Sequence, residues 1–187
     1  MRGTAMELLG KLEEAYQADR SAYLYTASSL EALVPHATDL GFIVRDLVSD
    51  GRLETLCDGL WLYRPMTGED PSFGRCLLEE ALLCLRPGCV SYESLESAAS
   101  QWGLISQVPI AHLMCMTTGE SGEWQIRDEV LEAVHTNLSE REIFKSTIDL
   151  GRGHVLRLAN RNRCLKDLLD CGRSVDLIDW EEVEGDD

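Results

Sequence analysis

Apolar side chains recur at helical spacing throughout the first fifty residues. The repeats predict helices over residues 6–18, 29–34 and 39–49, because each stretch places its apolar residues three or four positions apart. Ser28 and Thr38 precede the second and third stretches and are expected to be the N-caps of those helices. The chain is therefore expected to begin with three short helices.

Two short runs of β-prone residues follow the third predicted helix. Residues 52–56 and 60–65 flank the dipeptide Asp58-Gly59, which is typical of a tight hairpin turn. Three helices closed by a hairpin form a winged helix-turn-helix, in which the third helix is the recognition helix and the hairpin is the wing. We therefore predict a winged helix-turn-helix domain over residues 1–70.

The winged-helix prediction identifies the side chains expected at DNA. Arg45 is the sole cation on the polar face of the third predicted helix, and Arg52 and Arg64 flank the hairpin. Winged helices also serve as protein-binding modules, and the first 70 residues hold six basic and twelve acidic side chains, so an adaptor without DNA binding is the alternative. The residues expected to contact DNA are Thr38, Gly41, Phe42, Arg45, Arg52 and Arg64.

The remainder of the chain mixes helical and extended patterns. Residues 66–71, rich in Thr, Gly, acidic residues and Pro, predict a linker between two domains. Helices are expected at residues 73–86, 91–101, 162–171 and 174–183, and strands at residues 104–108, 110–117, 123–127, 130–136 and 154–159. Residues 71–187 are thus expected to form a small mixed α+β domain, and the whole chain an α+β fold.

Charge, apolar runs and cysteine content indicate which partners and which cellular location to expect. The chain of 187 residues has a formal net charge of −16, which argues against nonspecific nucleic-acid binding by the chain as a whole. It contains no run of the ~20 apolar residues that a membrane helix needs, and its first sixteen residues lack the apolar run of a signal peptide, so we expect a cytoplasmic protein. Seven cysteines without a Cys-x-x-Cys pair indicate reduced, packed thiols.

Charge is unevenly distributed near the C-terminus. Between Arg152 and Arg173, six basic residues accompany only two acidic ones, whereas residues 176–187 contain seven acidic residues and no basic one. Such a basic stretch would bind a protein partner or a nucleic-acid backbone, or would simply pair with the acidic residues that follow it. The residues expected at a partner are Arg152, Arg157, Arg161, Arg163, Lys166 and Arg173.

Sequence signatures of catalysis are missing. The chain has no GxxxxGK[ST], GxGxxG or HExxH motif, and its four histidines are dispersed. Serines recur every third residue from Ser91 to Ser100 on one predicted helix, and a serine stripe of this kind usually serves packing. The four tryptophans are expected to anchor cores. We therefore predict no catalytic residue, metal site or cofactor.

Several motifs in the second half resemble those of the AbiEi-type antitoxins of type IV toxin–antitoxin systems. The resemblance extends over about residues 24–183, and its specificity lies in the order and spacing of the motifs. The matching residues are Ser94-Leu95-Glu96-Ser97-Ala98, Trp102-Gly103-Leu104-Ile105, Thr117-Thr118-Gly119, Ala159, Asp167-Leu168, Gly172-Arg173 and Leu177. Residues 49–65 also resemble the wing that leads into the family's C-terminal domain.

The resemblance implies a function for each half of the chain. Antitoxins of this kind repress their own operon by binding inverted repeats of operator DNA through the winged helix. They also neutralise a cognate toxin with a nucleotidyltransferase fold, and they are not known as enzymes. The sequence departs from the family pattern at two positions, since Glu120 replaces a basic residue after Thr-Thr-Gly and Ser174 replaces an asparagine after Gly-Arg.

Overall fold

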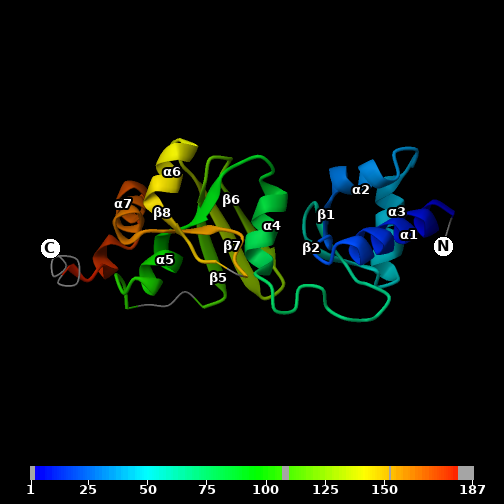
Figure 1. Ribbon diagram of the computed structural model, residues 1–187, viewed down its shortest axis with the longest axis horizontal. Helices are drawn as coiled ribbons and strands as arrows, with labels where there is room; N and C mark the ends of the chain where they lie inside the picture. Colours follow the sequence, from blue (N-terminus) through cyan, green and yellow to red (C-terminus); the bar gives the residue numbers. More distant parts are fainter. Residues whose placement is uncertain (1–2, 107–109, 152, 181–187) are drawn as a thin grey trace. The chain divides into compact units, whose positions relative to one another are not determined.

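The computed structural model describes residues 3–106, 110–151 and 153–180 (Figure 1). These residues form seven α-helices, one 3-10 helix and two β-sheets, so the predicted α+β fold class is confirmed. The chain divides into two compact units, Met1–Leu85 and Arg86–Asp187, which are described separately. No helix within the described ranges is long and apolar enough to cross a membrane.

The first unit places three helices around a small antiparallel sheet. Its sheet has the strand order β1-β3-β2, and β2 and β3 form a hairpin whose turn contains Asp58 and Gly59. Gly59 has a φ of +78°, a left-handed conformation that favours glycine at a tight turn. The elements are α1 (Gly3–Ala18), β1 (Leu24–Thr26), α2 (Ala27–Leu33), α3 (Leu40–Ser49), β2 (Leu53–Cys57), β3 (Leu60–Tyr63) and α4 (Leu77–Leu85).

Apolar burial holds the first three helices and the hairpin together. Leu8 and Leu12 of α1, Leu47 of α3, and Leu60 and Leu62 of β3 are all fully buried. Burying a leucine side chain contributes roughly 1.5–3 kcal/mol, so these five side chains supply much of the stability of the unit. The periodic apolar positions of the sequence therefore identified the correct inner faces of α1 and α3.

The helix starts in the first unit differ from those predicted. Thr26, rather than Ser28, caps α2 and forms a reciprocal capping box with Ser29. Asp39, rather than Thr38, caps α3, and its carboxylate accepts a hydrogen bond of 2.9 Å from the backbone N–H of Phe42. Each helix therefore starts after a residue whose side-chain oxygen accepts a hydrogen bond from the backbone N–H three residues later, which has no partner within the helix.

Helix α4 belongs to the first unit because it packs on β1 and β3. The Tyr23 hydroxyl, next to β1, donates to the Glu80 carboxylate, and the Arg75 guanidinium bonds the same carboxylate at 3.0 Å while lying 5.0 Å from the centre of the Tyr23 ring. The division between the units therefore follows Leu85, whereas the sequence predicted a boundary between residues 70 and 71, within a linker over residues 66–71. The predicted helix 73–86 also starts later, at Leu77.

The second unit is a six-stranded mixed sheet with α5 and α7 packed against each other. The strand order is β6-β7-β5-β4-β9-β8, in which β4 runs parallel to β9, β5 runs parallel to β7, and the other neighbours are antiparallel. The elements are β4 (Ser91–Glu93), α5 (Leu95–Gln101), β5 (His112–Thr117), β6 (Gly122–Ile126), β7 (Glu129–His135), α6 (Glu140–Ser146), β8 (Thr147–Asp149), β9 (Arg157–Ala159), α7 (Arg161–Cys171) and the 3-10 helix η1 (Val175–Leu177).

Several predicted elements of the second unit are wrong. Ser91 does not cap a helix, since it starts strand β4, so the predicted serine stripe is divided between a strand and α5. No strand forms over residues 104–106, where Ile105 makes only an isolated bridge to Ile178, and residues 107–108 lie outside the described ranges. The final predicted helix is reduced to η1, with residues 181–183 also outside those ranges.

The turn between β5 and β6 is built around the side chain of Arg86. Its guanidinium lies 4.7 Å from the centre of the Trp124 ring and donates hydrogen bonds to the carbonyl oxygens of Glu120, at 2.7 Å, and Ser121, at 3.2 Å. A Cβ atom added to Gly122 would lie 2.6 Å from the Trp124 ring and 2.8 Å from Arg86 Nη2. The absence of a side chain at Gly122 therefore allows Arg86 to pack on the Trp124 ring.

Replacing this glycine is expected to destabilise the protein. Gly122→Ala should lower the free energy of unfolding by about 1–3 kcal/mol, because the added methyl displaces Trp124 or Arg86 from close packing. Urea denaturation followed by circular dichroism measures the change. Gly10→Ala is the control, since nothing lies within 4 Å of its added Cβ in α1 and alanine favours a helix. Equal stability of the two variants would contradict the crowding argument.

Candidate DNA-binding and partner-binding surfaces

Helix α3 presents one exposed face that starts at its N-terminus. Gly41, Arg45 and Ser49 are exposed on this face, and Phe42 is half-buried beside them. Arg45 Nε donates a long hydrogen bond of 3.3 Å to the carbonyl oxygen of Gly41, and the guanidinium carbon lies 5.9 Å from the centre of the Phe42 ring. Arg45 forms no ion pair with any described residue, so its charge faces solvent.

The other cations predicted at DNA are held within the unit. Arg64 forms ion pairs with Glu54 and, at 3.2 Å, with Asp70. Arg52 is half-buried, and its backbone bonds to Leu47 at the end of α3 and to Arg64 across the hairpin. Thr38 is exposed one residue before the cap of α3. The structure thus leaves Thr38, Gly41 and Arg45 accessible but does not present Arg64 as an unpaired cation.

A groove lies between α3 and the hairpin, and the sequence analysis did not predict it. It has a volume of about 520 Å³ and a mainly apolar lining. Trp61 lines the groove and is half-buried, although it was expected to anchor a core. The alternation along β3 indicates that Trp61 lies outside the core. Leu60 and Leu62 are fully buried, and in a strand the residue between them points to the opposite face. The lining residues are Ala27, Leu40, Gly41, Val44, Arg45, Val48, Ser49, Thr55 and Trp61.

Two arginines of the basic stretch in the second unit are engaged by neighbouring strands and helices. Arg157 donates to the Thr147 hydroxyl at 2.8 Å and lies 5.2 Å from the centre of the Phe144 ring. Arg173 bonds Glu96 at 3.1 Å and Glu132 at 2.5 Å. These arginines therefore hold α5, α6, β7 and β8 together, and they are not available as a row of solvent-facing cations.

The remaining members of the basic stretch are dispersed. Arg163 pairs with Asp167 at 2.7 Å and with Asp170 at 3.3 Å, and its side chain is largely buried. Lys166 is exposed on α7, and Arg161 is half-buried in the first turn of that helix. Arg152 lies outside the described ranges. Arg163 and Arg173 thus pair with carboxylates of α5, β7 and α7. Most of the acidic residues that follow, 181–187, lie outside the described ranges.

Asp167 is the centre of a buried polar cluster that joins α7 to the strand β4. Its carboxylate accepts hydrogen bonds from the Ser94 hydroxyl at 2.6 Å and the Tyr92 hydroxyl at 3.1 Å, and it forms the ion pair with Arg163. Burial raises the pKa of the Tyr92 hydroxyl well above its usual range, and the Asp167 carboxylate raises that pKa further. Sequence reasoning missed the cluster, although the i, i+4 spacing of Arg163 and Asp167 on one helix was a usable signal.

The Gly-Arg-Ser sequence after α7 forms a clamp on α5. Gly172 ends the helix in the left-handed conformation, with a φ of +63° and its N–H bonded to the last turn. Arg173 and Ser174 then both bond Oε1 of Glu96, the serine hydroxyl at 2.7 Å. Ser174 also has a positive φ, of 51°, a conformation in which asparagine is enriched.

Comparison with known proteins finds similarity among solved structures alone. No protein-family model matches the sequence, and no curated protein matches it. Among solved structures, the chain is similar to the Rv2827c protein of Mycobacterium tuberculosis, with a TM-score of 0.49 and 17% sequence identity. The similarity covers 80% of this chain and 50% of that protein, so the chain spans about half the length of the solved structure that it matches.

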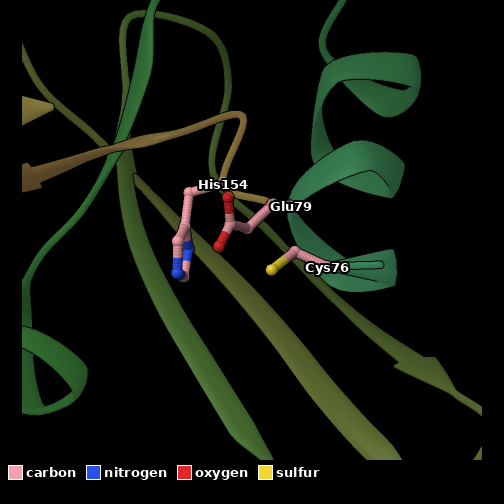
Figure 2. Close-up of side chains that lie close together, drawn as sticks. All are labelled: Cys76, Glu79 and His154. Atoms are coloured by element: carbon pink, nitrogen blue, oxygen red, sulfur yellow. The ribbon is translucent and has the colours of Figure 1, made fainter. Parts of the chain in front are cut away.

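Three potential metal ligands, Cys76, Glu79 and His154, are drawn in Figure 2. Cys76 immediately precedes α4 and Glu79 lies in its first turn, so both side chains leave the same side of the helix (Figure 2). His154 belongs to the second unit. Zinc sites in proteins use three or four protein ligands. Neither unit by itself supplies that number from these residues.

His135 is held by two oxygen acceptors at the turn after β5. Its Nδ1 lies 2.8 Å from the carbonyl oxygen of Gly119 and its Nε2 lies 3.1 Å from Oδ1 of Asn137. Because both ring nitrogens donate only when the imidazole is protonated, the bond to Gly119 and then that to Asn137 raise the pKa of His135 above its ordinary value of 6.5.

The raised pKa predicts a specific pH dependence. The stabilisation from protonated His135 should be complete below pH 6.5 and should be lost as the pH rises through the higher pKa of the folded protein. An NMR titration of the His135 C2 proton measures that pKa directly. Asn137→Ala should move the pKa back toward 6.5, because one acceptor is removed. A wild-type pKa at or below 6.5 would show that the two acceptors do not hold the protonated ring.

Proposed function

We propose that the protein is an antitoxin-like regulator with two binding modules. The first unit binds operator DNA as a winged helix-turn-helix and represses its own operon. The second unit neutralises a partner toxin that has a nucleotidyltransferase fold. On this proposal the protein is not an enzyme and acts in the cytoplasm.

The arrangement of α3 and the hairpin is the observation that carries the DNA-binding proposal. Helices α1, α2 and α3 precede the hairpin β2–β3, which is the order in which a winged helix offers its third helix to the major groove. On α3, the exposed Gly41 permits close approach, and the guanidinium of Arg45 extends from the same face without an ion-pair partner among the described residues. Arginine is the side chain most often used to read guanine in that groove.

The antitoxin part of the proposal is supported by the resemblance of the second unit to the AbiEi family. The residues that carry the resemblance occupy positions that fix the fold, since Ser94 and Asp167 form the buried polar cluster and Gly172 and Arg173 form the clamp on α5. Such residues are expected to be shared by chains of one fold. The surface that contacts the toxin would then lie on exposed positions such as Lys166 of α7.

Binding of the full-length chain to the DNA upstream of its own gene tests the first half of the proposal. Fluorescence anisotropy at several salt concentrations should show preference for this DNA over a scrambled duplex. We expect a shallow dependence on salt, with a log–log slope of about −1 to −3 per chain, because few cations face solvent on the DNA-binding side. Equal binding to both duplexes at every salt concentration would refute operator recognition.

Co-expression tests the second half of the proposal. A gene for a nucleotidyltransferase-like protein beside the gene of this chain would supply the toxin, and the full-length chain should restore growth of cells that express it. Lys166→Glu should weaken the rescue if α7 forms part of the contact surface. Failure of the wild-type chain to restore growth would refute the antitoxin assignment.

The scarcity of unpaired cations favours a second candidate, a winged-helix adaptor that binds protein and not DNA. Arg64 is held in ion pairs, Asp58 occupies the tip of the hairpin, and Asp39 and Asp46 accompany Arg45 on α3. Acidic side chains on the DNA-facing side repel phosphate. Toxin neutralisation without DNA binding at any salt concentration would support this adaptor.

A further inference from the structure

The groove between α3 and the hairpin combines an apolar lining with a single charged residue. Val44 of α3 is buried in its wall, and Leu40, Val48 and Trp61 are half-buried, so each of these three exposes part of its apolar surface. Arg45 is the only charged residue among the nine that line the groove. A ligand with an apolar body and one negative charge is complementary to such a lining.

The polar side chains of the lining are all able to donate hydrogen bonds. The terminal nitrogens of Arg45, the hydroxyls of Ser49 and Thr55 and the indole N–H of Trp61 lack a hydrogen-bonding partner within the described ranges of the chain. Among the nine described residues that line the groove, none contributes a side-chain carboxylate or amide oxygen. Donors without partners beside apolar surface favour a ligand that brings acceptor oxygens, and a carboxylate is the simplest such group.

The volume of the groove fits a small molecule. Ligand pockets in proteins measure about 300–1,000 Å³, and the groove measures about 520 Å³. A folded partner protein would contact about 20–30 residues on each side of an interface, far more than the nine residues here. A DNA backbone has no apolar body to cover Val48 and Trp61.

We propose that the groove binds a small carboxylic acid with an apolar body, of the aromatic or medium-chain aliphatic class. The apolar body covers Val44, Val48 and Trp61, and the carboxylate accepts hydrogen bonds from Arg45, with Ser49 or Thr55 as a further donor. Gly41 and Arg45 are also expected at DNA, so an occupied groove removes Arg45 from the operator. This regulatory consequence rests on the proposed DNA-binding function, whereas ligand binding itself does not.

Direct titration of the full-length chain tests the ligand site without DNA. The probes are 4-phenylbutyrate, naphthalene-2-carboxylate and decanoate, and the signal is the Trp61 indole resonance in a two-dimensional NMR spectrum. Trp61→Phe identifies that resonance by its disappearance. At least one probe should shift the Trp61 resonance and the backbone amide of Arg45 in a saturable way. No saturable shift with any of the three acids overturns the proposal.

Two matched comparisons test the role of the charge. The neutral amide of 4-phenylbutyrate and the Arg45→Gln variant should each reduce affinity at least tenfold. Arg52→Gln, which removes a nearby arginine that does not line this groove, should bind as the wild-type chain does. Unfolding temperatures of the variants show that each has folded. Equal affinity for acid and amide, or unchanged affinity of Arg45→Gln, overturns the proposal.

Operator binding in the presence of a saturating carboxylate separates the two proposals. We expect the affinity for operator DNA to fall at least tenfold when the groove is occupied. A chain that binds the carboxylate but no DNA would refute the proposed function and leave the ligand site intact. A chain that binds operator DNA equally well with and without the carboxylate would refute competition through Arg45.

Discussion

Asp167→Ala is expected to lower the free energy of unfolding by about 3–5 kcal/mol, because it removes one partner of a buried ion pair. The substitution leaves the largely buried Arg163 guanidinium without its nearest counter-charge and leaves the hydroxyls of Tyr92 and Ser94 without their acceptor. A loss of this size is a large fraction of the stability of an ordinary domain. Urea denaturation of the full-length chain measures it, and the second unit should unfold first.

Asp170 provides a matched control on the same helix. It also pairs with Arg163, at 3.3 Å, but its side chain is 76% exposed, whereas that of Asp167 is 2% exposed. Asp170→Ala should therefore cost no more than about 1 kcal/mol, as expected for an exposed ion pair. If the two variants lose the same stability, the ion pair at Asp170 matters as much as the buried cluster, and the account given for Asp167 is wrong.

Arg45→Ala is expected to weaken operator binding by about 1–3 kcal/mol if Arg45 reads a base edge. The expectation rests on its position, because it is exposed on α3 and has no ion-pair partner in the described part of the chain. The loss should be concentrated on one base pair of the operator, so a binding series with single base-pair changes would locate it. Anisotropy titrations at fixed salt measure the affinity.

Arg45→Lys separates base reading from attraction to phosphate. Lysine keeps the positive charge but lacks the planar fork of donors that bonds guanine twice. If Arg45 reads a base, the lysine variant should regain only a small part of the lost affinity. If Arg45 contacts phosphate, the lysine variant should bind nearly as well as the wild-type chain. Unchanged binding by Arg45→Ala would remove Arg45 from the interface altogether.

Much of the first unit could be predicted because its structure depends on local patterns. The apolar repeat of residues 40–48 lies within α3, and Asp58-Gly59 joins β2 directly to β3, so sequence alone located α3 and the hairpin. The N-cap residues were harder to predict. Thr26, Ser28 and Ser29 are all able to cap a helix, and only the backbone path decides among them. The groove was missed because Trp61 was assigned to a core without use of the alternation along β3.

The second unit was harder to predict because its short strands depend on distant partners. Strand β4 has only three residues, and it exists through pairing with β5 and β9. Its Ser91 therefore looked like a helix cap. Helix α6 was missed although Ser139 and Glu142 have capping-box spacing, which was a local signal that could have been used. The partners of Arg173, which are Glu96 and Glu132, lie far from it in sequence, so its pairing could not be foreseen.

The place of β9 in the second sheet has a consequence for the order in which the protein forms during synthesis. Strand β9 pairs with both β4 and β8, so it joins an early strand of the unit to a late one. Until β9 has left the ribosome, β4 lacks its parallel neighbour. The strands made by then that are adjacent in the sheet, β6, β7, β5 and β4, can form only a four-stranded part of it. The first unit has all three of its strands by Tyr63 and is complete at Leu85, so it is able to fold much earlier. A ribosome stalled before Arg157 would therefore carry a nascent chain whose helix α3 can already be formed while the sheet of the second unit is still incomplete.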